Sequence, residues 1–223
     1  ELEAFSYSIS HDLRAPLRAM QSFARILHEE CGPKVGPEGQ DYIRRIGTAA
    51  ERMDRLIRDV LAYSRVARTE VQPAPVPLDR LLEDILEAYP DLRAHGTHIQ
   101  LKGPFPAVLG NEAVLTQAIS NLLGNAVKFV PPGATPKVEV WAETMNETKT
   151  ARLFIKDNGI GIPPNLQERI FGIFERASTH YEGTGIGLAI VKKGMERLGG
   201  RVGLQSKPGQ GSTFWLELRL PEA

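Results

Sequence analysis

The chain has 223 residues, of which 42% are hydrophobic and 24% charged, and this is the composition of an ordinary soluble globular protein. Its 27 basic and 27 acidic residues balance, so the net charge gives no reason to expect nucleic acid or an anionic membrane as a partner. The single cysteine, Cys31, cannot form an intramolecular disulfide, and the sequence contains no apolar run of about 18 residues that could cross a membrane. We therefore expect a cytoplasmic protein without a nucleic-acid partner.

An apolar stripe predicts a long helix at the start of the chain. The stripe consists of Leu2, Phe5, Ile9, Leu13, Leu17, Met20, Ala24 and Leu27. His11 lies about 200° around this helix from Ile9 and from Leu13, so its side chain is predicted to point away from the stripe. Pro16 has no N–H to donate to the carbonyl of Asp12, and we expect it to interrupt the helix one turn after the histidine. A phosphate donor could then reach the imidazole.

A second stripe follows the turn-forming residues 31–40 and predicts a second helix. Its members are Ile43, Ile46, Ala50, Met53, Ile57, Val60 and Ser64. Two such helices joined by a short loop form an antiparallel hairpin, which cannot bury both stripes by itself. Pairing of two hairpins into a four-helix bundle would bury them, so we expect a homodimer. The alternative is a hairpin docked onto the rest of its own chain.

The second half of the chain is predicted to be an α/β sandwich with mostly meander-like strands. Residues 71–77 carry three prolines and are expected to form an extended linker. A helix should follow from Leu78 to Tyr89, with Asp79 as its N-cap. Further helices are expected at about 111–130 and 185–198, and strands at 98–102, 137–143, 151–157, 201–206 and 212–220.

Polar side chains repeat along the helix expected at 111–130. Gln117, Asn121 and Asn125 recur every four residues, and Lys128 follows near the end of the same helix. Because the helix is otherwise apolar and should be buried, these amides and this ammonium need partners. Mg²⁺ with a polyphosphate would provide them, with the Asn125 amide oxygen as a metal ligand and Lys128 balancing phosphate charge. The alternative is a polar helix face that caps neighbouring backbone.

Two glycine-rich segments complete the candidate site. In residues 157–163, Gly159 and Gly161 would let the backbone turn sharply and approach a flat ligand, while the Asp157 carboxylate could accept a hydrogen bond from an exocyclic amine. Residues 183–190 open a helix, where free N–H groups and the positive end of the helix dipole favour phosphate. This run follows a long irregular segment instead of a βα turn, which disfavours dinucleotide binding.

Together the motifs resemble the catalytic core of histidine kinases, and the resemblance covers essentially the whole chain. They are similar to the family's H box at residues 10–17, N box at 121–129, G1 box at 157–163, F box at 171–176 and G2 box at 183–188. The resemblance implies a dimerisation and histidine phosphotransfer domain over residues 1–70. It also implies an ATP-binding domain of the Bergerat type, shared with gyrase and Hsp90, over residues 78–223, with a mobile ATP lid at 171–184.

The resemblance further implies the roles of individual residues, with ATP and Mg²⁺ as cofactors. His11 would attack the γ-phosphate of ATP through Nε2, while Asp12 accepts a hydrogen bond from Nδ1–H. Mg²⁺ held by Asn125, together with Lys128 and Arg176, would offset charge on the transferring phosphoryl group. Asp157 would bind the adenine amine. The other expected nucleotide-binding residues are Gln117, Asn121, Gly159, Gly161, Thr184, Gly185, Gly187 and Leu188, and Asn121 is also an expected catalytic residue.

The resemblance also implies partners. The phosphohistidine would pass its phosphoryl group to an aspartate on the receiver domain of a response regulator. An upstream sensor domain is expected as well, because the helical pattern is already under way at Glu1. In many similar kinases the residue four after the histidine is Thr or Asn and is thought to orient a water for dephosphorylation of the receiver. Ala15 stands there, so we expect weak phosphatase activity.

Two other classes of protein stay open. One is a different Bergerat ATPase, which would leave the displayed His11 and the dimerising hairpin unexplained. The other is a catalytically silent dimeric scaffold, which the intact His11, Asn125, Asp157 and Gly185 argue against.

Overall fold

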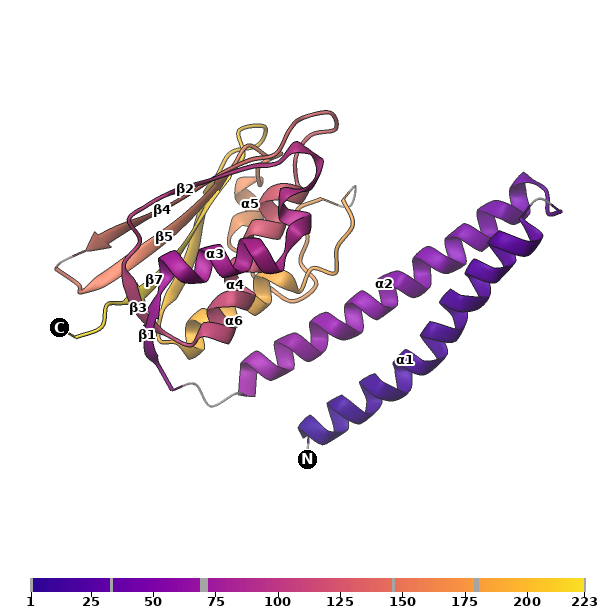
Figure 1. Cartoon of the computed structure of the whole chain (residues 1–223), viewed down its shortest axis with the longest axis horizontal. Helices are drawn as coiled ribbons and strands as arrows, with labels where there is room; N and C mark the ends of the chain where they lie inside the picture. Colours follow the sequence, from indigo (N-terminus) through magenta and orange to yellow (C-terminus); the bar gives the residue numbers. More distant parts are fainter. Residues whose placement is uncertain (1, 33, 69–71, 146, 179–180, 223) are drawn as a thin grey trace. The chain divides into compact units, whose positions relative to one another are not determined.

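The computed structural model describes the chain except for residues 1, 33, 69–71, 146, 179–180 and 223, and the side chains of residues 2–12 and of His95 also lie outside the description (Figure 1). The chain divides into two compact units, Glu1–Arg65 and Val66–Ala223. Among the helices of the described ranges, none has both the length and the apolar character that a bilayer crossing requires.

The first unit is the predicted antiparallel helical hairpin. Helix α1 covers Leu2–Ile26 and continues into a π-helical turn at Leu27–Cys31, and α2 covers Pro37–Arg68 (Figure 1). The expected interruption of α1 is wrong, because the helix continues through Pro16. The proline removes one backbone hydrogen bond, and the next residue, Leu17, is buried against α2 and holds this turn in place.

The hairpin buries only part of its two apolar stripes. Leu17, Ala50, Ile57 and Leu61 form its cluster of buried residues. Other large members of the stripes are exposed in the single chain, namely Leu13, Met20, Leu27, Ile46, Met53 and Val60. The hairpin therefore has one apolar seam between its helices and a second apolar surface without a cover in the described part of the chain.

The second unit contains a five-stranded sheet in the order β2-β4-β5-β7-β6. The strands are β2 His98–Lys102, β4 Lys137–Met145, β5 Thr150–Asp157, β6 Arg201–Ser206 and β7 Ser212–Arg219. The pairs β4–β5, β5–β7 and β6–β7 are antiparallel, whereas β2 and β4 are parallel. The predicted meander-like arrangement is thus confirmed for the hairpins β4–β5 and β6–β7, but not for β2. Helix α4 lies between β2 and β4 in the chain and carries the chain back, so that β4 runs in the same direction as β2.

Three helices cover one face of this sheet (Figure 1). They are α3 Leu78–Ala88, α4 Glu112–Lys128 and α6 Gly187–Arg197, accompanied by the short turns η2 Pro90–Gly96 and α5 Pro164–Gln167. Helix α4 is almost fully buried along one side, with Leu115, Ile119 and Leu122 inaccessible to solvent. Its start is fixed by Asn111, whose side chain accepts a hydrogen bond from Val114 N at 3.2 Å.

On the other face, a row of aromatic side chains crosses the sheet. Trp141 lies opposite Phe154, which lies opposite Trp215 on the next strand. The first two rings stack at 4.9 Å with an angle of 9° between their planes, and the guanidinium of Arg152 lies 4.6 Å from the Trp215 ring. Such cross-strand pairs stabilise the sheet on the face opposite α3, α4 and α6.

Two predictions for the segment before and at the start of α3 are wrong. Ala74–Pro77 forms β1, which pairs antiparallel with β3 at Ala107–Gly110, although residues 71–77 were expected to be a linker. The prolines are tolerated because β1 has a single partner strand. Asp79 is not the N-cap of α3: Pro77 occupies that position, and Asp79 Oδ1 instead accepts a hydrogen bond from Phe105 N at 3.4 Å.

Candidate functional site

Three segments that the sequence singled out converge in the second unit. They are the C-terminal half of α4, the turn at residues 157–163 after β5, and the start of α6. The amide of Ile160 donates to the carbonyl of Phe129, just past α4, at 2.8 Å. A Cβ on Gly187 at the start of α6 would lie 3.3 Å from Oδ1 of Asn121 on α4. The polar face of α4 thus lies beside both glycine-rich segments.

Asp157 is the buried acid of this site. It ends β5, and the residue is 8% exposed. Its Oδ1 accepts hydrogen bonds from Gly159 N at 2.8 Å and from Ser212 N at 3.0 Å, while Oδ2 has no hydrogen-bond partner among the described residues. Burial raises the pKa of the Asp157 carboxyl above its ordinary value, and this effect outweighs the two backbone hydrogen bonds, which lower the pKa. One carboxylate oxygen is therefore held by the protein and the other remains for a ligand.

The glycines at 159 and 161 make room for the protein's own backbone. A Cβ on Gly159 would collide with the carbonyl of Phe129, and one on Gly161 would collide with the carbonyl of Lys207. Gly161 also has a φ of +70°, which L side chains rarely adopt. The predicted sharp turn is confirmed, but the close approach at these two glycines is to neighbouring turns.

The amides along α4 differ in their partners. Nδ2 of Asn121 donates to the carbonyl of Gln117 in the same helix at 2.9 Å. This bond agrees with the alternative interpretation of α4, in which its polar side chains bond to neighbouring backbone. Asn125 is half-buried, and its amide makes no hydrogen bond within the described part of the chain. Lys128 is exposed, lies 5.2 Å from the Phe129 ring centroid, and its Nζ is near Gly183.

A Mg²⁺ ion carried by a nucleotide fits these donors. Such an ion usually has few protein ligands, since phosphates and waters supply the rest. The Asn125 amide supplies an oxygen of the kind the ion requires. No group of three or more His, Cys, Asp or Glu side chains that could hold a metal by itself occurs among the described residues. A metal here would therefore depend on phosphate oxygens as well as on the protein.

The start of α6 has the open N–H groups of an anion site. Its N-cap, Ile186, makes no side-chain capping hydrogen bond, and the Thr184 hydroxyl accepts a hydrogen bond from the Ile186 amide at 3.3 Å. Gly185, with a φ of +76°, lies against Phe174, whose amide donates to the Gly185 carbonyl at 2.9 Å. Leu188 is half-buried and packs against the core. The first turn of α6 is thus fixed, and among the described residues its N-cap makes no side-chain capping hydrogen bond.

The segment predicted as a lid is tied to the end of α4 by Tyr181. Its hydroxyl donates to the carbonyl of Val130 at 2.8 Å, and its ring lies 5.3 Å from that of Phe129. Nη2 of Arg176 donates to the Tyr181 carbonyl at 2.5 Å. In this arrangement one nitrogen of the Arg176 guanidinium bonds to the lid's own backbone, and the guanidinium has five N–H donors in total. Sequence reasoning did not identify Tyr181, because a lone tyrosine in an irregular segment carries no periodic signal.

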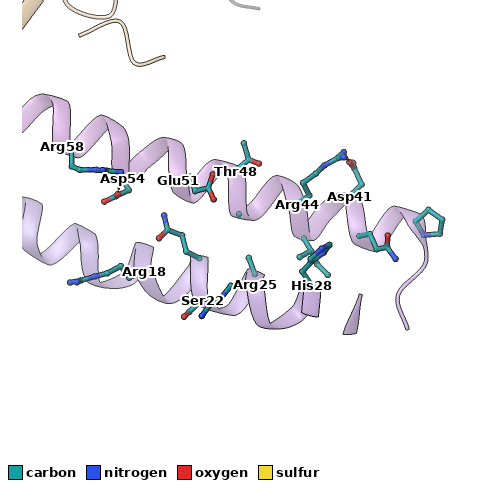
Figure 2. Close-up of a pocket in the computed structure, with 16 residues that line it drawn as sticks. Arg18, Ser22, Arg25, His28, Asp41, Arg44, Thr48, Glu51, Asp54 and Arg58 are labelled. Atoms are coloured by element: carbon teal, nitrogen blue, oxygen red, sulfur yellow. Dashed lines mark hydrogen bonds and ion pairs between the residues drawn. The ribbon is translucent and has the colours of Figure 1, made fainter. Parts of the chain in front are cut away.

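The hairpin contains the other predicted residues. His11 and Asp12 belong to α1, but their side chains lie outside the described part of the structure. A polar groove of about 1120 Å³ runs between α1 and α2 toward the hairpin turn (Figure 2). It is lined by side chains that include Arg18, Ser22 and Arg25 from α1, His28 from the π-helical turn that follows α1, and Asp41, Arg44, Thr48, Glu51, Asp54 and Arg58 from α2. The sequence did not reveal this groove, because it depends on how the two helices face each other.

Comparison with known proteins agrees with this geometry. Residues 1–68 match the His Kinase A (phospho-acceptor) domain, and residues 110–222 match the histidine kinase-, DNA gyrase B- and HSP90-like ATPase domain. The chain is 34% identical to the methanogenesis regulatory histidine kinase FilI of Methanothrix harundinacea, over 99% of this chain and 25% of that protein. It is 37% identical to the sensor histidine kinase AruS of Pseudomonas aeruginosa, over 97% of this chain and 22% of that protein.

Solved structures give the same result. Full-length ShkA in complex with AMPPNP superposes with a TM-score of 0.70 and 31% identity, covering 98% of this chain and 46% of ShkA. The fold and the ordered motifs define a phospho-acceptor helical domain joined to an ATPase domain. The chain belongs to the histidine kinase family and contains its catalytic core. It spans about a quarter of the length of the curated relatives it matches.

Proposed function

We propose that the chain is an ATP-dependent protein histidine kinase that phosphorylates His11 and passes the phosphoryl group to an aspartate of a response regulator. The observation that carries the proposal is Asp157, a buried carboxylate with one oxygen held by backbone N–H groups and the other without a hydrogen-bond partner among the described residues. A carboxylate in this state accepts a hydrogen bond from an amine, and adenine presents one.

The nucleotide would extend from Asp157 along the three converging segments. Adenine would bind at Asp157, beside the turn formed by Gly159 and Gly161. The phosphates would bind at the start of α6, where the N-cap Ile186 leaves the first turn of the helix without a side-chain cap. Asn125 would hold Mg²⁺, which neutralises phosphate charge when bound. Gln117 and Asn121 continue the same polar face of α4.

The chemical step would use residues from both units. His11 would attack the γ-phosphorus through Nε2, the P–O bond to ADP would break, and ADP would leave. Asp12 would hold the imidazole in the required tautomer by accepting the Nδ1–H hydrogen bond. Lys128 and Arg176 would stabilise negative charge on the phosphoryl group.

A homodimer is part of the proposal. The exposed apolar residues of the hairpin, such as Met20, Ile46 and Met53, lie on the stripes that the sequence predicted for a bundle. The hairpin of a second copy has the same surface, so a two-fold arrangement would cover both. The family membership of the first 68 residues supports this arrangement.

The response regulator is the proposed acceptor. The polar groove between α1 and α2 includes Arg18, seven residues after His11 and therefore about 10 Å further along α1. A receiver domain bound there would lie close to the phosphohistidine. The proposal also includes a sensor domain in the parent protein and a location in the cytoplasm.

Autophosphorylation tests the proposal directly. The chain is incubated with γ-labelled ATP and Mg²⁺, and protein-bound label is examined for stability in acid and in base. A phosphohistidine is labile in acid and stable in base, whereas phosphoserine has the opposite behaviour. Release of inorganic phosphate without protein-bound label would instead indicate a different Bergerat ATPase. Nucleotide binding without either reaction would indicate a silent scaffold.

A variant separates metal from base recognition. Asn125→Ala should weaken Mg²⁺-dependent nucleotide binding and abolish transfer, while binding of the nucleotide in the presence of a chelator changes little. Calorimetry with and without Mg²⁺ measures the difference. Equal loss of affinity under both conditions would contradict the metal role of Asn125.

A further inference from the structure

The turn that holds Asp157 lies against a second turn, which connects β6 and β7. The amide of Gly209 in this second turn donates to the Ile160 carbonyl at 2.7 Å. A Cβ on Gly211 would collide with the carbonyl of Asp157, as one on Gly161 would with Lys207. The two turns are therefore in direct backbone contact, and a small shift of one moves the other.

Ser206, at the end of β6, connects the two turns through its hydroxyl. Its Oγ accepts a hydrogen bond from Ile162 N at 2.8 Å and donates to the carbonyl of Gly211 at 2.9 Å. It also lies 2.9 Å from Oγ of Ser212. A hydroxyl has one hydrogen, which here goes to Gly211, so Ser212 is the donor in the bond between the two serines. The Ser206 hydroxyl thus uses its hydrogen and both lone pairs.

These bonds lead to the carboxylate of Asp157. The backbone N–H of Ser212 is one of the two donors to Asp157 Oδ1, and the N–H of Gly159 is the other. Gly159 belongs to the first turn and Ser212 begins β7 directly after the second, so the orientation of the carboxylate depends on the spacing between the turns. Ser206 fixes that spacing because it bonds to Ile162 in the first turn and to Gly211 and Ser212 beside the second.

We propose that Ser206 is a positioning residue for base recognition. Its hydroxyl holds the two turns at the separation that directs Asp157 Oδ2 toward the amine of adenine. The inference rests on the proposed function, because it assumes that Asp157 binds the base. Ser206 itself need not touch the nucleotide. Its effect should therefore appear in the choice between bases and not in the affinity for phosphates.

The test compares Mg·ADP with Mg·GDP by calorimetry on the full chain. Guanine carries a carbonyl oxygen where adenine carries the amine, so it gains nothing from a well-placed carboxylate. In Ser206→Ala we expect the affinity for ADP to fall about tenfold, the usual order for one misplaced hydrogen bond, and the affinity for GDP to stay unchanged. The preference for ADP should fall by the same factor. Ser206→Thr keeps the hydroxyl and should restore the preference.

Two further variants complete the test. Thr148→Ala removes a hydrogen-bonded hydroxyl in the turn between β4 and β5, at the other end of β5 from Asp157, and should leave both affinities unchanged. Ser206→Cys provides a side chain of similar size with a weak donor. It therefore tests the role of the Ser206 hydroxyl if Ser206→Ala does not fold. It should lower the preference for ADP as well.

The outcomes separate this inference from the proposed function. A preference for ADP that persists in Ser206→Ala and Ser206→Cys, or an equal loss of ADP and GDP affinity, would overturn the role of Ser206 alone. A wild-type chain that binds ADP and GDP equally would contradict base recognition by Asp157 and with it the present inference. Loss of preference in the Ala and Cys variants, with recovery in Ser206→Thr, would support it.

Discussion

The two units of this chain differ in how completely they bury their own apolar residues. The α/β unit has a continuous core in which side chains such as Leu122 of α4 and Leu153 of β5 are inaccessible to solvent. The hairpin buries a small cluster between its helices and leaves Met20, Ile46 and Met53 about half exposed. The α/β unit can therefore complete its fold within one chain, whereas the hairpin needs a second surface.

The largest expected effect separates the chemistry of the two units. His11→Gln should abolish protein-bound label completely, because an amide nitrogen cannot replace the imidazole as nucleophile. Affinity for ADP should stay unchanged, since the proposed nucleotide site lies entirely in the α/β unit. Autoradiography measures the first and calorimetry the second. Label that survives in the variant would remove His11 from the mechanism.

The next effect concerns the dependence of the hairpin on a partner. Ile46→Glu places a carboxylate on the exposed apolar surface of α2, and a symmetric dimer would bury it twice. We expect the dissociation constant of the dimer to rise at least about hundredfold, the order of a few kcal/mol. Sedimentation over a range of concentrations measures it. Thr48→Glu, on the groove side of the same helix, is the matched control and should leave the dimer intact. Equal dissociation in both variants would contradict the assigned surface.

A third effect tests the proposed site through pH. Because burial raises the folded-state pKa of Asp157 above its ordinary value of 3.8, the carboxyl is protonated at a pH where free aspartate is ionised. Binding to the adenine amine requires the carboxylate, so affinity for ADP should fall by up to about tenfold per pH unit as pH drops below the raised pKa. Asp157→Asn should bind weakly and without this dependence. The same slope in wild type and variant would assign the titration to another group.

Asp157→Asn, which is expected to weaken ADP binding, is expected to stabilise the ligand-free fold. A folded pKa above the unfolded value means that the stability contributed by Asp157 is present at low pH and is lost as pH rises through the folded pKa. Asp157→Asn avoids this loss, so at neutral pH the ligand-free variant should unfold at a higher temperature than wild type, while at acidic pH the two should converge. Calorimetric scans at several pH values measure both. A lower unfolding temperature at neutral pH would contradict this account.

The smallest effect is expected at Ala15, which is exposed on α1. A methyl group cannot orient a water molecule, so the chain should dephosphorylate the proposed partner, a phosphorylated receiver domain, slowly. Ala15→Thr should accelerate this reaction by roughly tenfold, the order of one hydrogen bond. Decay of the phosphorylated receiver, followed with the chain and ADP, provides the measurement. Rapid decay with the unmodified chain, unchanged by the substitution, would place the phosphatase determinant elsewhere.

What the sequence could predict depends on how local the signal is. The stripes of the hairpin and the alternation in β5 depend on periodicity, and the turn at Gly161 depends on conformational freedom, so all three were predicted. Ser206 and Ser212 were not identified, because only the register between β6 and β7 brings their hydroxyls together. β1 was missed because a proline-rich strand carries no strand propensity of its own.

The aromatic row on the open face of the sheet has a practical consequence. The chain contains two tryptophans, and both Trp141 and Trp215 belong to this row and therefore to the α/β unit. Indole emission of the intact chain thus reports the folding of that unit alone, while the long helices of the hairpin contribute strongly to circular dichroism at 222 nm, a wavelength typical of helices in general. A single heated sample followed by both signals would distinguish separate melting of the two units from one cooperative transition.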